Sequence, residues 1–295
     1  MKYVIHPNLS KKSAFETTVR VCSLLRDTDS ELCMSDRLAD SFRGTEGITF
    51  EPEGSLFLRA DFAIVIGGDG TILQCAGRIL DFADCHRTAP VPIVGINTGT
   101  LGFLAAIEAD ELDMLAKLRQ GDYAISERML LQCTFGSGDE TVFHALNDIY
   151  ASRLNGTISD FEVFVDDVQI GRYRADGIIF STPTGSTAYA LSAGGPVMEP
   201  DLSLIEMNLV CPHSLFARPM LFSPKRRIRV AYRGTGTGSL SVFADGTQAS
   251  VLHNTQSFTV TQSPRRMPFI NCKGTAFYDA LNGKLMQPLK GFSES

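Results

Sequence analysis

One acidic side chain stands in a glycine-rich turn, in the sequence Gly67-Gly68-Asp69-Gly70. The apolar residues before it, 62–66, are rich in β-branched types and predict a buried strand. From Thr71 onward, apolar residues recur every three or four positions, which is typical of one face of a helix. A strand, a glycine turn and a helix N-terminus form a natural seat for a phosphate group. The alternative interpretation of Asp69 is a plain turn or helix-capping residue.

An amide and a carboxylate stand side by side at Asn147-Asp148, at the end of a predicted strand. Together they can donate to and accept from the vicinal hydroxyls of a ribose or an amide-bearing ring. A second polar stretch, 243–248, is either a hairpin turn or a means of bringing Gln248 to a bound substrate. For the Asn147-Asp148 pair, too, a turn without a ligand stays open as the alternative.

The run 176–196 leads from a strand through a turn rich in hydroxyl side chains and glycine into a short helix. Its hydroxyl groups and open backbone amides suit a nucleotide, and Tyr189 could stack on that nucleotide or hydrogen-bond to it. The run is too apolar between its polar positions for a disordered linker.

A second glycine-rich turn, 95–104, follows another predicted strand. It falls short of the dinucleotide-binding fingerprint because Asn97 stands where the first glycine of that pattern belongs. The sequence has no Walker A motif.

Strands and helices alternate in the first part of the chain, which predicts an α/β domain with a parallel sheet. We expect strands at 3–6, 62–66 and 91–96, one weak strand within 30–60, and helices at 13–25, from 71 onward, and at 109–120 with Gly121 as its C-cap. After residue 122, short alternating strands predict an all-β, sandwich-like domain. They are expected at 129–135, 141–146, 161–166, 168–173, 177–181, 228–232, 239–244 and 257–262, with turns at 136–139 and 234–238. The predicted division is therefore 1–122, 123–270 and a tail, 271–295, that packs back on the first domain.

Composition sets broad limits on the function. The chain has 295 residues, 44% hydrophobic and 20% charged, with a net charge of −6, so it predicts a globular protein that does not bind nucleic acid. Seven cysteines without a Cys-x-x-Cys pair predict reduced thiols, and Cys211-Pro212-His213 is interpreted as structural. No signal peptide or membrane-length apolar run is present, so we expect a soluble cytoplasmic protein without a membrane partner.

These stretches resemble the NAD kinase family in their order and spacing. The resemblance rests on the Gly67-to-Gly70 turn, the 95–104 turn, Asn147-Asp148, and the run Gly185-Ser186-Thr187-Ala188-Tyr189 with Gly194-Gly195-Pro196. Pro212-His213-Ser214-Leu215 and Arg218-Pro219 are similar as well. It covers residues 60–270 and, more loosely, the N-terminal strand and helix. Gly-Gly-Asp-Gly also occurs in lipid kinases and phosphofructokinases, whereas the Gly-Ser-Thr-Ala-Tyr run is far more specific.

The resemblance implies a two-domain architecture, with a Rossmann-like α/β N-terminal domain and a β-rich C-terminal domain that binds NAD. It implies phosphoryl transfer from ATP, or another phosphoryl donor, to the 2′-hydroxyl of the adenosine ribose of NAD, giving NADP. Asp69 would be the general base, because an attacking hydroxyl must lose its proton; holding the metal or orienting the hydroxyl stays open for this residue. A divalent cation, Mg²⁺, would be carried by the donor phosphates, and no side chain is assigned as a metal ligand.

The resemblance also implies a set of nucleotide-binding residues and a homodimer or homotetramer. The set comprises Gly68, Asp69, Gly70, Asn147, Asp148, Arg174, Asp176, Thr184, Ser186, Thr187, Ala188, Tyr189, Ala190, Leu191, Ser192 and Gln248. Members of the family often carry a basic residue shortly after the Asn-acid pair, where this chain has Thr157-Ile158-Ser159, so that contact is absent or supplied elsewhere. Two rival functions stay open: a non-catalytic NAD(P)-sensing protein, and a lipid or sugar kinase that shares only the Gly-Gly-Asp-Gly turn.

Overall fold

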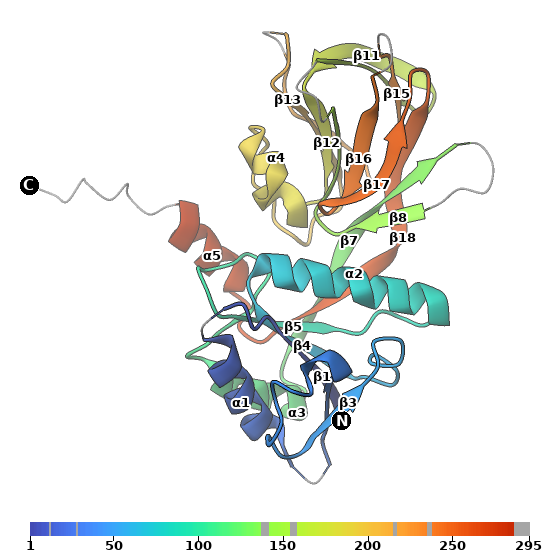
Figure 1. The fold of residues 1–295 in the computed structure, drawn as a ribbon. Helices are drawn as coiled ribbons and strands as arrows, with labels where there is room; N and C mark the ends of the chain where they lie inside the picture. The colour runs from blue at the N-terminus through green and yellow to red at the C-terminus, as the bar shows by residue number, and fades with distance from the viewer. Residues whose placement is uncertain are drawn as a thin grey trace, which may run out of the picture. The chain divides into compact units, whose positions relative to one another are not determined.

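The computed structural model of the chain describes residues 1–11, 13–27, 29–136, 142–153, 158–214, 217–234 and 238–285. The chain divides into two compact units (Figure 1). The first comprises Met1–Glu127 together with the chain from Met267 onward, and the second comprises Arg128–Arg266. The limits predicted from the sequence, after residues 122 and 270, lie a few residues from these.

A parallel sheet forms the centre of the first unit. Its order is β3-β2-β1-β4-β5, with β6 and the end of β18 also paired to β5. The strands are β1 (Lys2–Pro7), β2 (Glu31–Ser35), β3 (Ile48–Glu51), β4 (Phe62–Gly67), β5 (Ile93–Asn97), β6 (Ile107–Glu108) and β18 (Ser257–Asn271). Strand β4 is buried along its whole length, as its run of apolar residues requires when both faces of the sheet are covered.

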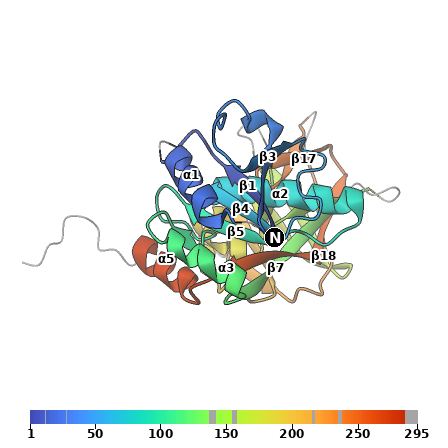
Figure 2. The ribbon, with the colours of Figure 1, turned by 90° about the horizontal axis from the view of Figure 1, so that it is seen from below.

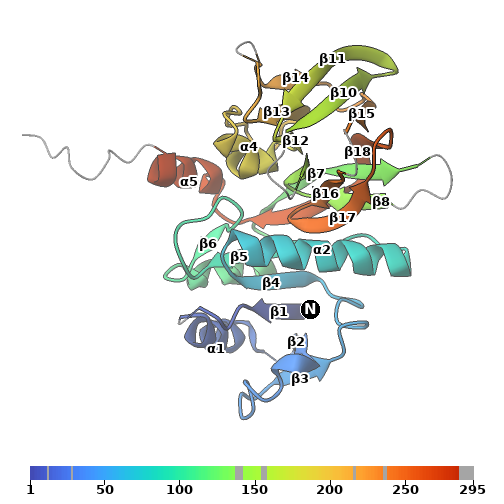
Figure 3. The same ribbon diagram turned by 45° about the horizontal axis from the view of Figure 1, so that its top comes forward.

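Helices cover both faces of this sheet. Figures 1 and 3 show α2 (Asp69–His86) on one face of β4 and β5 and α1 (Ala14–Leu25) on the other. The apolar side of α1 packs with η2 (Leu112–Leu115) and α3 (Ala116–Gln120) against side chains of β1 and β4, and Figure 2 shows these helices around the strands. A last helix, α5 (Ala276–Leu285), also belongs to this unit.

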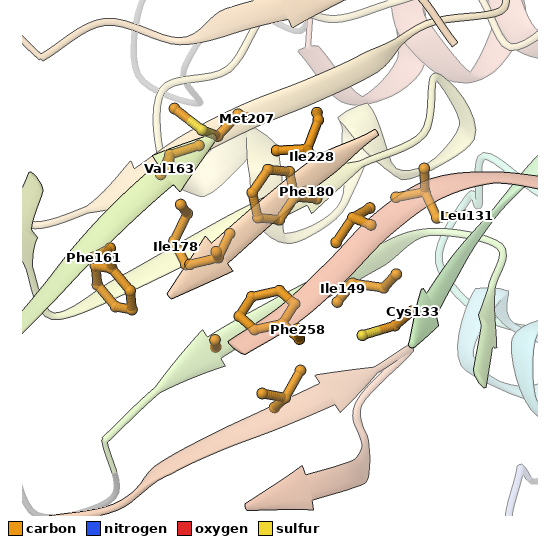
Figure 4. Close-up of a cluster of buried hydrophobic side chains, with 14 of the residues drawn as sticks. Leu131, Cys133, Ile149, Phe161, Val163, Ile178, Phe180, Met207, Ile228 and Phe258 are labelled. Carbon is orange, nitrogen blue, oxygen red and sulfur yellow. The ribbon is translucent and has the colours of Figure 1, made fainter. Parts of the chain in front are cut away.

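Two antiparallel sheets form the second unit. One has the order β14-β13-β12-β9-β16-β17, and the other contains β11-β10-β15-β18, with β7 paired to β18 and β8. Their strands are β7 (Ala124–Phe135), β8 (Val142–Ala145), β9 (Asp148–Ser152), β10 (Ser159–Val165), β11 (Val168–Ala175), β12 (Gly177–Ser181), β13 (Ile205–Val210), β14 (Met220–Phe222), β15 (Ile228–Tyr232), β16 (Leu240–Ala244) and β17 (Thr247–Leu252). Buried side chains from both sheets meet in one core, where the rings of Phe180 and Phe258 lie edge to face at 6.3 Å (Figure 4).

The predicted fold class, an α/β domain with a parallel sheet and an all-β domain, is confirmed. The helix predicted at 109–120 is wrong in its first half, because residues 109–110 form a turn and residues 112–115 the 3₁₀ segment η2 before α3 begins at Ala116. Gly121 does end α3 in the left-handed conformation, with φ of 69°. Residues 30–60 hold two strands rather than one, and β9, β13, β14 and β17 were not predicted. The predicted turns at 136–139 and 234–238 lie mostly outside the described residues.

Candidate functional site

Asp69 lies in the first turn of α2, directly after the buried strand β4. Gly67 allows the chain to turn tightly there, because a Cβ at that position would lie 2.7 Å from the Cβ of Thr71. Gly68 forms the N-cap of α2, and the Asp69 side chain is about one third exposed. The carboxylate is therefore fixed at the C-terminal end of a central parallel strand, which is where ligands bind in open α/β sheets.

The second glycine-rich turn holds the Asp69 carboxylate. The backbone N–H of Phe103 donates to Oδ2 at 3.0 Å, and the N–H of Leu104 donates to Oδ1 at 3.1 Å. Gly102 has to be glycine for this approach, because a Cβ would collide with Oδ1 of Asp69 and lie 3.0 Å from its Cγ. The two turns thus belong to one arrangement, since β4 and β5, which lead into them, are parallel neighbours.

A cation lies near the same carboxylate. Lys284, in the last turn of α5, places its Nζ 3.8 Å from Oδ2 of Asp69 and 4.7 Å from the centre of the Phe103 ring. An ion pair at this distance is electrostatic rather than a hydrogen bond. The acidic turn is therefore approached by backbone amides from one segment and by an ammonium group from another.

In the second unit, the turn that carries Asn147 is tied to the turn that follows β12. Thr182 donates from its hydroxyl to the carbonyl of Leu146 at 2.6 Å and from its backbone N–H to the carbonyl of Asn147 at 2.9 Å. The backbone N–H of Gly185 in turn donates to the Thr182 hydroxyl at 3.0 Å. A side chain at residue 185 would collide with the Asn147 carbonyl, so glycine permits this close approach.

Two polar atoms of these joined turns are buried without a hydrogen-bond partner among the described residues. They are Oδ1 of Asn147 and Oγ1 of Thr184. Buried polar atoms are normally satisfied, and an orphan costs on the order of 1–3 kcal/mol. Orphans of this kind suit a ligand with its own donors and acceptors, such as a nucleotide.

Asp245 organises the turn at Asn147. It lies in the tight turn between β16 and β17, in the left-handed conformation with φ of 47°. Its carboxylate accepts hydrogen bonds from the backbone N–H groups of Leu146, Asn147 and Asp148, at 2.7, 2.8 and 3.1 Å. Three converging amides fix the direction in which the Asn147 and Asp148 side chains leave the backbone.

The two carboxylates of this arrangement share an unusual electrostatic environment. Burial raises the pKa of Asp148 to about 7, and the nearby Asp245 charge raises it as well. Burial raises the pKa of Asp245 to about 6, against the three backbone N–H groups that lower it. Shifts of this kind concentrate at functional sites, because binding and catalysis need groups poised near neutrality.

Aromatic rings stand beside Asp148. Tyr150 stacks on Phe243 with ring centres 4.6 Å apart, and Tyr189 lies edge-on to Tyr150 at 5.3 Å. Tyr189 is 39% exposed, so one ring of the group is open to solvent. Planar aromatic surfaces next to hydrogen-bonding groups are suited to a heterocyclic base.

The sequence-predicted residues of the second unit differ in what they offer to a ligand. Asn147, Asp148 and Thr184 lie together through the joined turns, with Tyr189 nearby across Tyr150. Ser186 and Ala190 are buried, and the Ser186 hydroxyl is used within the protein, donating to the Pro183 carbonyl at 2.7 Å and accepting from the Met198 N–H at 3.0 Å. The remainder are Thr187, Ala188 and Leu191, which are half-buried, and Arg174, Asp176, Ser192 and Gln248, which are exposed.

Arg174 lies on β11, in the other sheet of this unit, and Gln248 lies on β17, at the edge of the sheet that contains β9 and β12. The Arg174 side chain is paired with Asp160 at 3.6 Å, and Gln248 lies opposite Phe243 in the β16–β17 ladder. Gly68 and Gly70 flank Asp69 in the first unit. Of the stretch Thr157-Ile158-Ser159, where the resemblance led us to expect a basic side chain, Thr157 lies outside the described residues and Ser159 is buried.

Sequence reasoning missed Asp245, Tyr150, Phe243 and Lys284 as members of these arrangements. Asp245 lies within the stretch 243–248, from which the sequence indicated only Gln248 as a residue that could reach a substrate. The signal available for it was Asp-Gly between two strands, which predicts only a tight turn. Lys284 carried no local signal, because its relation to Asp69 arises from packing across the whole length of the unit.

The described residues contain no group of three or more histidine, cysteine, aspartate or glutamate side chains placed to hold a metal ion. The chain, as far as it is described, thus presents no metal cage of its own. Mg²⁺ commonly takes only one or two protein carboxylates and completes its shell with substrate phosphates and water. Asp69, partly exposed at a helix N-terminus, fits that mode.

None of the described helices is long and apolar enough to cross a membrane.

Comparison with known proteins gives one consistent result. Residues 3–123 match the model of the ATP-NAD kinase N-terminal domain, and residues 146–272 match that of the ATP-NAD kinase C-terminal domain. The NAD kinase of Caldanaerobacter subterraneus is 34% identical over 294 residues, which cover 97% of this chain and 99% of the relative. The NAD kinase of Symbiobacterium thermophilum is 38% identical over 241 residues, covering 79% and 81%.

Two solved structures share the fold. The crystal structure of yeast NADH kinase complexed with NADH superposes with a TM-score of 0.88 at 24% identity, covering all of this chain and 90% of that one. The crystal structure of an NAD kinase from Archaeoglobus fulgidus in complex with ATP gives a TM-score of 0.72 at 25% identity, covering 96% and 98%.

Proposed function

The chain belongs to the NAD kinase family, and from this premise we propose how its residues divide the work of phosphorylating NAD. The reaction transfers the γ-phosphoryl group of ATP to the 2′-hydroxyl of the adenosine ribose of NAD and gives NADP. The observation that carries the proposal is the Asp69 carboxylate, held in the first helical turn after β4 by the N–H groups of Phe103 and Leu104.

Asp69 acts as the general base in this proposal. The 2′-hydroxyl attacks phosphorus and loses its proton to the carboxylate, provided that the two lie within hydrogen-bond reach. Each carboxylate oxygen receives one backbone hydrogen bond and has further lone pairs for a substrate hydroxyl. Because the two amides fix the side chain beforehand, little reorganisation is needed during the reaction.

Asn147, Asp148 and Thr184 bind the nucleotide, with Tyr189 and Tyr150 beside its base. The orphan oxygens of Asn147 and Thr184 accept hydrogen bonds from NAD, and this removes the desolvation cost that they carry in the free protein. Gly68, Gly70, Arg174, Asp176, Thr187, Ala188, Leu191, Ser192 and Gln248 complete the proposed contacts, whereas Ser186 and Ala190 shape the turn from within.

Members of the family are generally dependent on a divalent metal. We propose Mg²⁺, which the ATP phosphates would carry; holding the ion is the alternative to the role of Asp69 as the base. When bound, the ion neutralises charge on the phosphates. The protein's own part is to orient the hydroxyl and to hold the proton at Asp69.

The test is NADP formation by the purified protein with NAD, ATP and Mg²⁺, run beside Asp69→Asn. We expect the variant to lose at least about a hundredfold in kcat, since general bases contribute about 10²–10⁴-fold. The KM for NAD should stay close to that of the wild type. An unchanged kcat would remove Asp69 as the base, and binding of NAD without turnover on any donor would favour the sensing function.

Phosphorylation of a lipid or sugar in place of NAD would favour the other rival function, a lipid or sugar kinase. The arrangement of Asn147, Asp148 and the aromatic rings disfavours this rival function, because a small sugar would not need such an arrangement. We also propose that the chain assembles as a homodimer or homotetramer. Light scattering coupled to gel filtration decides this, and a monomeric mass at working concentration would contradict it.

A further inference from the structure

The C-terminal helix α5 contacts the turn that holds Asp69. Both belong to the first unit, and Figures 1 and 3 show α5 beside the start of α2. The ring of Phe277 lies 6.3 Å from that of Phe103, measured between ring centres. The ammonium of Lys284 lies over the Phe103 ring, 4.7 Å from its centre. Phe103 therefore links helix and carboxylate, since its N–H holds Oδ2 of Asp69.

Gly283 is adapted to this contact. Glycine inside a helix costs about 1 kcal/mol relative to alanine, so its presence before Lys284 calls for a packing reason. A Cβ at residue 283 would collide with a methyl group of Leu101, which lies in the Asp69-holding turn, two residues before Phe103. The backbone of α5 at Gly283 therefore lies directly against the side chain of Leu101, one residue before Lys284.

Among the described residues, the Lys284 ammonium donates no hydrogen bond. It carries three donors, and its Nζ lies 3.8 Å from Oδ2 of Asp69, which is beyond hydrogen-bond range. Among the described residues its recorded contacts are this ion pair and the Phe103 ring. The side chain is 32% exposed, so a substrate can reach it.

We propose that Lys284 is a further catalytic residue that binds the transferring phosphoryl group of ATP. The inference rests on the proposed function. A lysine serves phosphate as a compact point charge, and phosphoryl transfer depends mainly on stabilising charge on the equatorial oxygens. Lys284 exchanges its ion pair with Asp69 for hydrogen bonds to these oxygens when ATP binds.

Proton and charge balance without a change in Lys284 itself. The ribose oxygen forms a bond to the γ-phosphorus, the bond from that phosphorus to the β–γ bridging oxygen breaks, and ADP leaves. The hydroxyl proton passes to Asp69. Lys284 takes no part in the proton transfer, and its ammonium faces the equatorial oxygens of the transferring phosphoryl group.

The experiment compares Lys284→Met and Lys284→Arg with Lys117→Met as the matched control. Lys117 lies in the same unit, is 37% exposed and forms an ion pair with Asp122, away from Asp69. We expect Lys284→Met to lower kcat about hundredfold, as loss of one stabilising donor does. Lys284→Arg should recover part of this loss, the KM for NAD should be unchanged, and Lys117→Met should behave as the wild type.

A second readout does not depend on turnover. Affinity for the non-hydrolysable analogue AMP-PNP, measured by calorimetry with Mg²⁺, should fall about tenfold in Lys284→Met, which corresponds to 1.4 kcal/mol, whereas affinity for adenosine should not change. A lowered melting temperature identifies a variant in which α5 no longer packs on the first unit. Wild-type kcat and AMP-PNP affinity in a folded Lys284→Met would overturn the inference while leaving the kinase activity intact. Failure of the wild type to make NADP would instead overturn the proposed function, and the AMP-PNP comparison would still decide the role of Lys284.

Discussion

Gly102→Ala is expected to lower activity by displacing the Asp69 carboxylate, which the substitution leaves chemically unchanged. A Cβ at this position would collide with Oδ1 of Asp69 and would lie 3.0 Å from Cγ and 3.3 Å from Oδ2. Ordinary contact begins at 3.4 Å, so the carboxylate has to retreat and lengthen its hydrogen bonds from Phe103 and Leu104. A displacement of about 1 Å in a catalytic group can cost about 10²-fold in rate, and we expect a loss of that size in kcat.

The control is Gly99→Ala in the same turn, where a Cβ meets nothing nearer than Oδ1 of Asn97 at 4.0 Å. Steady-state NADP formation measures kcat for both variants, and chemical denaturation measures the free energy of unfolding. In an Asp69→Ala background, Gly102→Ala should cost almost no stability, since the colliding carboxylate is gone. A kcat for Gly102→Ala within twofold of Gly99→Ala would refute the claim that Asp69 acts from this position.

Asp245→Asn should raise the Kd for NAD, because an amide cannot accept all three backbone hydrogen bonds and each charge-assisted bond contributes about 1.5–3 kcal/mol; calorimetric titration with NAD measures this Kd, and an unchanged value would contradict the prediction. The pKa of Asp148, about 7 when folded against 3.8 for the free side chain, means that the folded protein binds more protons than the unfolded chain between these values. The free energy of unfolding gained from this group therefore falls as pH rises from 4 to 7, and Asp148→Asn should flatten that slope in denaturation curves at several pH values. Gly185→Ala should lower the free energy of unfolding by about 1–3 kcal/mol, and with it the melting temperature, because the new methyl group collides with the Asn147 carbonyl. A melting curve like that of the wild type would show that the two turns are not tightly packed.

Local sequence patterns predicted the elements that local physics determines. Strand β12 was predicted with the bounds observed, because a short, uninterrupted apolar run between turn signals is typical of a buried strand. Strand β13 was missed because Glu206 and Asn208 interrupt its apolar pattern, although both side chains are buried and hydrogen-bonded to each other at 2.6 Å. Tertiary burial decided that segment, and a single sequence carries no record of it.

Site residues follow the same division. Asp69 was found from its glycine turn, whereas Asp245 acts on amides 97 to 99 residues away, and no spacing rule reaches that far. Lys284 likewise meets Asp69 only after the sheet and α5 have assembled. What the sequence could supply was the type of chemistry and one member of each cluster. The partners that orient these members come from long-range packing, so they had to be read from the structure.

The site residues of the two units differ in how many of their polar atoms are hydrogen-bonded before substrate binds. Both oxygens of Asp69 already receive backbone hydrogen bonds, whereas Oδ1 of Asn147 and Oγ1 of Thr184 are buried without partners among the described residues. The first condition favours rate, because a preorganised base needs no rearrangement in the transition state. The second favours specificity, because a ligand that lacks the matching groups leaves both atoms unpaired, at a cost of about 1–3 kcal/mol each. Discrimination among nucleotides should therefore depend on Asn147 and Thr184, and the rate of transfer on Asp69.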